Sequence, residues 1–345
     1  MTLTEQIKAK ALELGFDKVG VSPANVPSPA AFLTTWLANG YHGDMRWLAR
    51  APERRMDPRK VLPGARSVIS LATNYYTEAH TQTDHPDIGK LSRYAWGDDY
   101  HPIILKRLRR LHDDILAREP GIQTRYYVDT GPVMEKAFAQ QSGLGWIGKH
   151  TNVITEEYGS WMFLSEILVT AVLDYDLPAD DQCGHCRLCI DACPTEAIVA
   201  PYVLDARRCI PYLTIELRSD IPEDLRPLMG NHVFGCDICQ EVCPWNAQPV
   251  ITKEAAFRAR ATTEAASLAS FAECRPEDFN EIFHHSAVKR AKWAGLLRNV
   301  MVAIGNSRNP HLIPVLKRAL ARTEAMVSTH AKWALARLRS HLLAS

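Results

Sequence analysis

The chain has 345 residues, of which 46% are hydrophobic and 23% charged, with 40 Lys and Arg against 39 Asp and Glu. This length and balance exclude a disordered, collagen-like or low-complexity chain and leave room for two to three domains of about 100–200 residues. No apolar run reaches the roughly 18 residues of a membrane-spanning helix, and the N-terminus lacks the apolar centre of a signal peptide. We therefore expect a monomer in the cytoplasm with no membrane partner.

Residues 1–180 predict a mixed α/β domain. Apolar spacing indicates helices at 4–15, 104–116 and 133–141 and strands at 16–21, 67–73, 124–128, 152–155 and 160–173, the last two as a pair. Asp129 follows a predicted strand, where α/β sheets place ligands, but it can equally cap the helix that comes next. Asp98, Asp99 and His101 are further acid–base candidates, although His101 taken alone is typical of a surface or capping histidine.

Eight of the nine cysteines fall within 181–250, which predicts a small domain stabilised by metal. The run Cys183-x2-Cys186-x2-Cys189-x3-Cys193-Pro is that of bacterial two-cluster ferredoxins, in which the fourth cysteine binds the other cluster. This exchange assigns Cys183, Cys186, Cys189 and Cys243 to cluster 1 and Cys193, Cys209, Cys236 and Cys239 to cluster 2, both 4Fe–4S. One or two structural zinc sites are the alternative, but zinc does not explain the full run or the repeated Cys-Pro. Cys274 stands apart and is expected to be inert.

The C-terminal segment 262–345 is predicted to be helical and basic. Residues 289–345 contain eleven Lys and Arg and one acid, a net charge of +10, which favours a nucleic-acid partner over a merely solvated surface. The tetrapeptide Ala-Lys-Trp-Ala occurs at 291–294 and again at 331–334. A period of about 40 residues made of paired helices is typical of HEAT repeats.

Four motifs, together with the eight cysteines, resemble the epoxyqueuosine reductase family over nearly the whole chain. They are RRMDPRKVLPGARSVIS, RYAWGDDYH, YYVDTGPVMEKAFAQQSGLGWIGKH and GCDICQEVCPWN. That family is similar to the reductive dehalogenases in pairing two 4Fe–4S clusters with cobalamin. The resemblance implies an N-terminal cobalamin domain at 1–180, a ferredoxin-like domain at 181–250 and a HEAT-like helical domain at 262–345. It also implies reduction of the epoxide of epoxyqueuosine, at the wobble position of tRNA, to queuosine.

The resemblance carries roles onto individual residues. It implies that Asp129 is the proton donor, for which we expect a buried carboxyl, and that Asp99 and His101 belong to the substrate pocket. Cobalamin contacts carry over to Arg55, Ser92, Asp129, Val153, Thr155, Leu164, Pro211, Cys236 and Asp237. Ser92 and Lys136 stand at positions that vary in the family, so neither receives a specific role.

The same resemblance implies the partners. They are a tRNA with a GUN anticodon and a small electron donor such as a flavodoxin or a ferredoxin. The tRNA contacts are expected at Lys317, Arg318, Arg322 and Lys332. The sequence has no Asp-x-His-x-x-Gly corrinoid motif, so cobalamin is expected base-off, without a protein histidine on the cobalt.

Two other functions remain open from the residues alone. A reductive dehalogenase-like corrinoid enzyme acting on a small molecule would have no use for the basic tail, and such enzymes tend to carry an export signal. An electron-transfer iron–sulfur protein does not explain an α/β domain of about 180 residues with an Asp at the end of a strand.

Overall fold

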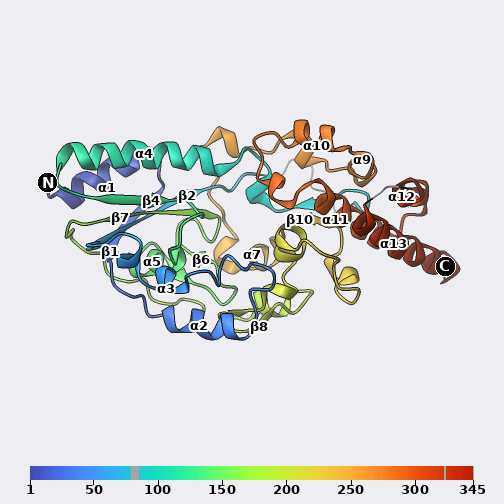
Figure 1. The fold of residues 1–345 in the computed structure, drawn as a ribbon, viewed down its shortest axis with the longest axis horizontal. Coiled ribbons are helices and arrows are strands. Elements are labelled where there is room, and N and C mark those ends of the chain that lie inside the picture. The colour runs from blue at the N-terminus through green and yellow to red at the C-terminus, as the bar shows by residue number, and fades with distance from the viewer. Residues whose placement is uncertain (79–84, 322–323, 345) are drawn as a thin grey trace.

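A four-stranded antiparallel sheet forms the centre of the N-terminal half in the computed structural model, which describes residues 1–78, 85–321 and 324–344. In spatial order its strands are β1 (Lys18–Pro23), β2 (Ser67–Asn74), β7 (Met162–Val169) and β4 (Thr124–Tyr127). Helices α1 (Leu3–Glu13) and α4 (Tyr100–Arg118) cover one face, and α5 (Glu135–Gln141) covers the other (Figure 1). Every residue of β2 is buried because both faces are covered.

The sequence of α4 explains how it packs. Ile104, Leu108, Leu111 and Ile115 recur at helical spacing and are all fully buried against the sheet. Asp99 caps the helix by accepting a hydrogen bond from the backbone N–H of His101 at 3.0 Å. The first turn of α4 is thereby fixed at the end of the sheet from which the functional site is built.

One predicted strand pairing is wrong. Strand β6 (Val153–Ile154) pairs with β5 (Trp146–Ile147), whereas β7 pairs with β2 and β4. A Cβ atom at Gly145 would lie 2.1 Å from the carbonyl oxygen of Ile154, so only glycine permits this close hairpin. Because the sheet is antiparallel, the rule that places ligands at the ends of parallel strands does not apply to it.

The cysteine-rich segment is made of short elements. They are α6 (Leu188–Asp191), β8 (Ile198–Ala200), β9 (Val203–Leu204), a π-helical turn (Tyr212–Glu216), β10 (His232–Phe234) and α7 (Ile238–Glu241). Strand β10 pairs in parallel with β3 (Lys90–Leu91), which joins this segment to the N-terminal half. Helices α2 (Ala30–Ala38) and α3 (Pro52–Met56) lie in the connection from β1 to β2, and the Trp36 indole of α2 donates to the carbonyl of Leu204 at 2.7 Å.

The C-terminal segment is helical, as predicted. Its helices are α8 (Ala261–Glu264), α9 (Leu268–Glu273), α10 (Pro276–Ile282), α11 (Trp293–Asn306), α12 (Ile313–Leu320) and α13 (Ala325–Ala344). The two Ala-Lys-Trp-Ala tetrapeptides occupy different positions, since Lys292 precedes α11 with a φ of 63° and Lys332 lies inside α13. The HEAT-like repeat therefore stays a prediction. Within the described residues no helix is long and apolar enough to cross a membrane.

One of the tail's eleven basic residues is a core residue. Arg298 is fully buried in α11, and its guanidinium donates to the carbonyls of Leu217 at 3.0 Å and Ser219 at 2.7 Å, and also to that of Leu213. Arg298 thus joins α11 to the cysteine-rich segment. It is unavailable to a nucleic acid, and the basic surface is smaller than the sequence predicts.

Candidate functional site

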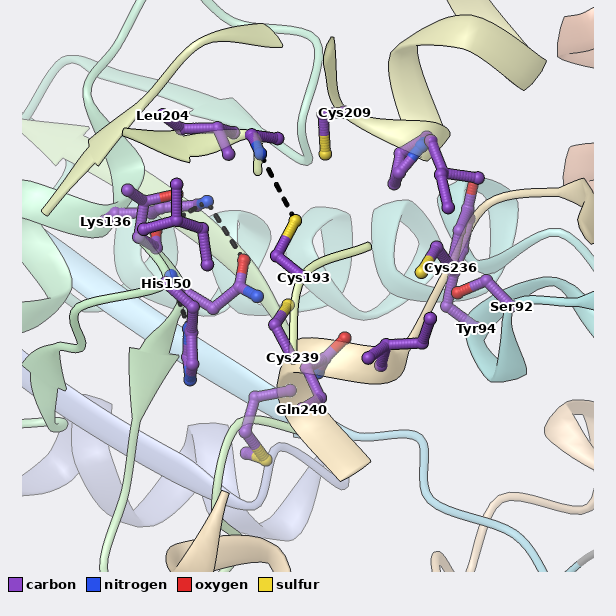
Figure 2. A pocket seen from close by; sticks show the side chains of 18 of the residues that line it. Ser92, Tyr94, Lys136, His150, Cys193, Leu204, Cys209, Cys236, Cys239 and Gln240 are labelled. Carbon is purple, nitrogen blue, oxygen red and sulfur yellow. Dashed lines mark hydrogen bonds between the residues drawn. The ribbon is translucent and has the colours of Figure 1, made fainter. Parts of the chain in front are cut away.

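The site is a cavity of about 440 Å³ between the sheet and the cysteine-rich segment. In Figure 2, Cys193, Cys209 and Cys239 lie between Lys136 and His150 on one side and Cys236, Ser92 and Tyr94 on the other. Tyr75, Tyr100, Met162, Phe163 and Leu164 supply aromatic and apolar parts of the lining. A largely apolar cavity with a few polar groups is the usual form of a cofactor site.

Asp129 lies at the edge of this cavity, two residues after β4 ends. Its backbone has a φ of 56°, the left-handed region, and its Oδ2 accepts a hydrogen bond from the Tyr100 hydroxyl at 2.6 Å. It does not cap a helix, because α5 begins at Glu135 with Met134 as its N-cap residue. The expected burial is also wrong, since 65% of the Asp129 side chain is exposed. Its carboxyl group is therefore held by Tyr100 at an open edge of the cavity.

Asp99 and His101 lie beside Asp129. The Nδ1 atom of His101 is 2.7 Å from Oδ1 of Asp99, and its Nε2 atom is 3.8 Å from Oδ2 of Asp129. Burial raises the pKa of Asp99, but hydrogen bonds from the His101 ring and backbone outweigh it, and the net pKa is lowered. The Asp99 anion favours a proton on Nδ1, which leaves Nε2 directed toward Asp129. His101 is thus more than a capping residue, as it joins two carboxylates.

Three titratable side chains near Asp129 received no functional role from the sequence, Lys136 because its position varies in the family and Glu135 and Glu166 because they were not singled out. Burial, and after it the charge of Asp129, raises the pKa of Glu135 to about 7. Lys136 donates from Nζ to the carbonyl of Thr151 at 2.9 Å. Glu166, in β7, is 1% exposed, and neither of its carboxyl oxygens has a hydrogen-bond partner among the described residues. Burial raises its pKa well above the usual range, so Glu166 is neutral. A lone Glu within the apolar run of β7 is the signal that could have identified it.

The cysteines fall into the two sets that the exchange pattern assigns. Cys193, Cys209, Cys236 and Cys239 line the large cavity, and Cys183, Cys186, Cys189 and Cys243 line a second cavity of about 50 Å³. Among the described residues, no three or more His, Cys, Asp or Glu side chains are placed to hold a single metal ion. Four thiols around a cavity suit a 4Fe–4S cluster, in which each iron takes one cysteine. Cys274 is buried elsewhere, and its thiol donates to the carbonyl of Arg275.

The nine predicted cobalamin contacts divide into two groups. Ser92, Asp129, Leu164, Pro211 and Cys236 line the large cavity, whereas Arg55, Val153, Thr155 and Asp237 are not part of its lining. Asp237 forms a hydrogen bond to a residue that lines the cavity, and Arg55 to one that lies two positions after Asp129. Asp237 accepts from the Ser92 hydroxyl and from the Arg93 backbone N–H at 2.7 Å, and Arg55 donates to the carbonyl of Gly131 at 3.3 Å. Val153 and Thr155 are buried, with 5% and 0% of their surface exposed.

The predicted tRNA contacts lie at the C-terminal end of the molecule, away from β4 and α4 (Figure 1). Lys317 on α12 and Lys332 on α13 are exposed. Arg318 forms an ion pair with Glu273, and Arg322 lies outside the described residues. Lys317, Arg318 and Lys332 are therefore separate from the cavity that Asp129 lines.

Another basic segment borders the site directly. The backbone N–H of Asp99 donates to the carbonyl of His285 at 2.7 Å, and Arg290 forms a two-point ion pair with Glu216, with both contacts at 2.9 Å. His285 and Lys292 have positive φ values of 52° and 63°, which non-glycine residues rarely adopt. Backbone strain of this kind concentrates at functional sites. The segment 284–292 thus contacts Asp99 through His285 and carries the exposed basic residues Arg290 and Lys292.

Comparison with known proteins gives a consistent result. The family model described as "Epoxyqueuosine reductase QueG, DUF1730" matches residues 55–130, and that of the "4Fe-4S double cluster binding domain" matches residues 182–246. The chain is 40% identical over 337 residues to the epoxyqueuosine reductase of Escherichia coli (strain K12), with 97% of this chain and 89% of that protein covered. It is 43% identical over 342 residues to the enzyme of Pseudomonas aeruginosa, covering 97% of this chain and 94% of that one. A crystal structure of epoxyqueuosine reductase with an epoxyqueuosine-modified tRNA-Tyr stem loop superposes with a TM-score of 0.91 at 29% identity, covering 97% of this chain and 90% of that chain.

Proposed function

The chain belongs to the epoxyqueuosine reductase family and is an oxidoreductase, and on that premise we propose that its large cavity reduces the epoxide of epoxyqueuosine in tRNA to the alkene of queuosine. One observation supports this most strongly. Asp129, with two potential proton donors beside it, and the four cysteines of cluster 2 line the same cavity. Reductive removal of the epoxide oxygen consumes both protons and electrons, so their sources must lie close to the same bound substrate.

The balance of the reaction defines what the residues must do. Conversion of an epoxide to an alkene releases its oxygen as water and consumes two electrons and two protons. We assign the first proton to Asp129, which protonates the oxygen as the ring opens. The Tyr100 hydroxyl orients the donor through its 2.6 Å hydrogen bond. His101 takes a proton from solvent on Nε2, 3.8 Å from Asp129, and as imidazolium returns it to the carboxylate, while Asp99 holds the ring through Nδ1.

The aromatic and apolar lining with its few polar side chains suits an organic cofactor, and we assign base-off cobalamin to the cavity. When bound, cobalamin supplies a strongly reducing metal centre that accepts single electrons and acts on the carbon–oxygen bond. Ser92, Leu164, Pro211 and Cys236 would contact it, together with Asp129. Arg55 and Asp237 would not contact cobalamin themselves. Arg55 would hold the loop that carries Asp129, through the carbonyl of Gly131, and Asp237 would hold Ser92. Val153 and Thr155, which are buried, would pack behind the residues that line the cavity.

Electrons would enter from a small redox protein such as a flavodoxin or a ferredoxin, at cluster 1. Cys186 is exposed, and beside it Leu188 and Trp245 are 51% and 37% exposed. An apolar surface over a cluster ligand permits close approach of another redox centre. Cluster 2 then lies on the side of the cavity where the substrate is reduced.

The tRNA, with a GUN anticodon, would bind through its phosphates to exposed cations. Segment 284–292, whose His285 contacts Asp99, supplies the exposed Arg290 and Lys292 and the half-buried Lys289, and α12 and α13 supply Lys317 and Lys332. Arg318 and Arg322 remain proposed contacts, the first in competition with Glu273. Lys and Arg contacts of this kind give affinity that falls with salt and little sequence readout.

The test is anaerobic reconstitution with iron, sulfide and cobalamin, followed by incubation with epoxyqueuosine-containing tRNA and a chemical reductant. We expect the absorption bands of bound cobalamin and, after digestion of the tRNA, queuosine in place of epoxyqueuosine. A protein that retains no cobalamin, or that leaves the epoxide intact with both clusters loaded, would contradict the proposal.

A further inference from the structure

His150 is buried between the two cavities. It is 4% exposed and belongs to the lining of both the large cavity and the smaller one. Neither the proton-donating residues nor the cysteine sets include it. A buried polar ring at the boundary of two cofactor sites therefore has no role in the reaction described so far.

The hydrogen bonds of the ring define its protonation. The Nδ1 atom of His150 accepts a hydrogen bond from the backbone N–H of Asn152 at 3.2 Å, a contact drawn as a dashed line in Figure 2. An imidazole ring whose Nδ1 accepts a hydrogen bond carries its proton on Nε2. The ring therefore presents an N–H donor at Nε2.

This donor has no hydrogen-bond partner among the described residues. Buried donors are almost always paired, and one left unpaired often marks the place of a bound group. The smaller cavity, about 50 Å³, is lined by four cysteines and by Ile154, Leu188, Pro244 and Trp245 beside His150. A cluster that fills such a narrow space leaves no room for water against its walls.

The neighbouring residue also points to cluster 1. Lys149 is 8% exposed, and its Nζ donates to the carbonyls of Gly184 and Cys186, the latter at 2.8 Å. These carbonyls belong to the loop that carries three of the cluster 1 cysteines. Consecutive residues thus face the same site, with Lys149 holding the loop and His150 forming part of the cavity wall.

We propose that the Nε2–H of His150 donates a hydrogen bond to a sulfur atom of cluster 1 and raises the reduction potential of that cluster. The inference rests on the cysteine assignment within the double-cluster domain and is independent of whether the substrate is epoxyqueuosine. Reduction adds one negative charge to the cluster, and a hydrogen bond to sulfur stabilises the reduced form more than the oxidised form. His150, through this direct hydrogen bond, makes cluster 1 a better electron acceptor from the external donor.

The test compares His150→Phe with His150→Gln in protein loaded with both clusters, by a redox titration monitored by electron paramagnetic resonance without tRNA. His150→Phe removes the donor, and we expect the one-electron reduction equilibrium of cluster 1 to become about tenfold less favourable, which is 59 mV. His150→Gln keeps an N–H donor and is expected to recover part of the loss. The potential of cluster 2 should stay unchanged. Equal cluster 1 potentials in all three proteins, or a shift confined to cluster 2, would overturn the proposal.

A measurement that needs no change at His150 covers the case in which His150→Phe fails to assemble the cluster. Protein labelled with ¹⁵N-histidine is reduced, and pulsed electron paramagnetic resonance measures the nitrogen coupling to cluster 1. His185 is replaced by Gln, because this exposed histidine lies in the same cysteine loop. We expect a ¹⁵N coupling in this background. Its absence from a fully loaded cluster would disprove the hydrogen bond, whatever the activity of the enzyme.

Discussion

The two sides of the large cavity come from different parts of the chain and bring different chemistry. Asp129, Tyr100 and His101 come from the sheet domain, joined by hydrogen bonds and by contacts within 4 Å. The opposite side comes from the cysteine-rich segment, with four thiols and no carboxylate among its described lining residues. The difference shows that protons and electrons reach the substrate through separate structures. A substitution can therefore remove the source of protons while the path of electrons remains, or the reverse.

The largest effect is expected on the electron side. Cys209→Ser removes a ligand of cluster 2 and should abolish reduction of the tRNA, because no electron reaches the large cavity. Iron should fall from about eight to about four atoms per chain, since each cluster contains four. The matched control is Cys274→Ser, a buried cysteine outside both sets, which should keep all its iron. Normal turnover in a Cys209→Ser protein that contains one cluster would refute this electron path.

A smaller effect is expected on the proton side from Tyr100→Phe. The change removes the hydroxyl that donates to Asp129 but keeps the ring, which stacks on Phe163 with the two ring centroids 4.0 Å apart. Hydrogen bonds to charged groups contribute about 1.5–3 kcal/mol, so kcat should fall about 10- to 100-fold with both clusters intact. Stopped-flow measurement of cluster reduction should give the wild-type rate. Slower cluster reduction would mean that proton donation and electron transfer do not depend on separate structures.

Affinity for tRNA is expected to depend on position along the molecule. Lys289→Gln with Lys292→Gln should weaken binding about tenfold, and Lys317→Gln with Lys332→Gln only about threefold, because the first pair belongs to the segment whose His285 contacts Asp99. Each lost phosphate contact should lower the salt slope of log K by about 0.7–0.9. Fluorescence anisotropy against salt measures both effects. Equal slopes in all proteins would assign both pairs to an ordinary solvated surface.

The smallest effect concerns stability. Glu166 is buried and neutral, with its pKa raised, so the folded protein binds a proton that the unfolded chain releases above about pH 4.3. This contribution to stability is complete below that pH and is lost as the pH rises toward the folded pKa. Tm should therefore fall less between pH 5 and pH 8 in Glu166→Gln than in the wild type. Glu196→Gln, with its side chain 87% exposed, is the control and should follow the wild type.

Local sequence signals predicted much of this structure. The helix α4, the strands near 18–23, 67–74 and 124–127 and the grouping of the cysteines all follow from spacing within a few residues. Pairings between distant segments did not follow, because nothing in a strand such as 153–154 specifies its partner. Composition also gave no sign that Arg298 is a core residue, since burial of an arginine depends on carbonyls some 80 residues away.

The functional site shows the same limit. Asp129 was selected by a strand-end rule that an antiparallel sheet does not obey, and its partners Tyr100 and His101 lie 29 and 28 residues earlier in the chain. Only the fold brings them together. His150 lay inside a recognised motif, but its role depends on two cavities that form between segments.

The central claim is that Asp129 delivers the proton to an epoxide that the clusters reduce. The most direct test is a single turnover, in which anaerobically reduced holoenzyme is mixed with epoxyqueuosine-tRNA while cluster absorbance and queuosine are followed together. The wild type should form queuosine as its clusters reoxidise. Asp129→Asn should keep both clusters and cobalamin, yet form queuosine about 10²–10⁴-fold more slowly, the usual contribution of a general acid. Queuosine formation by Asp129→Asn at the wild-type rate would contradict the account.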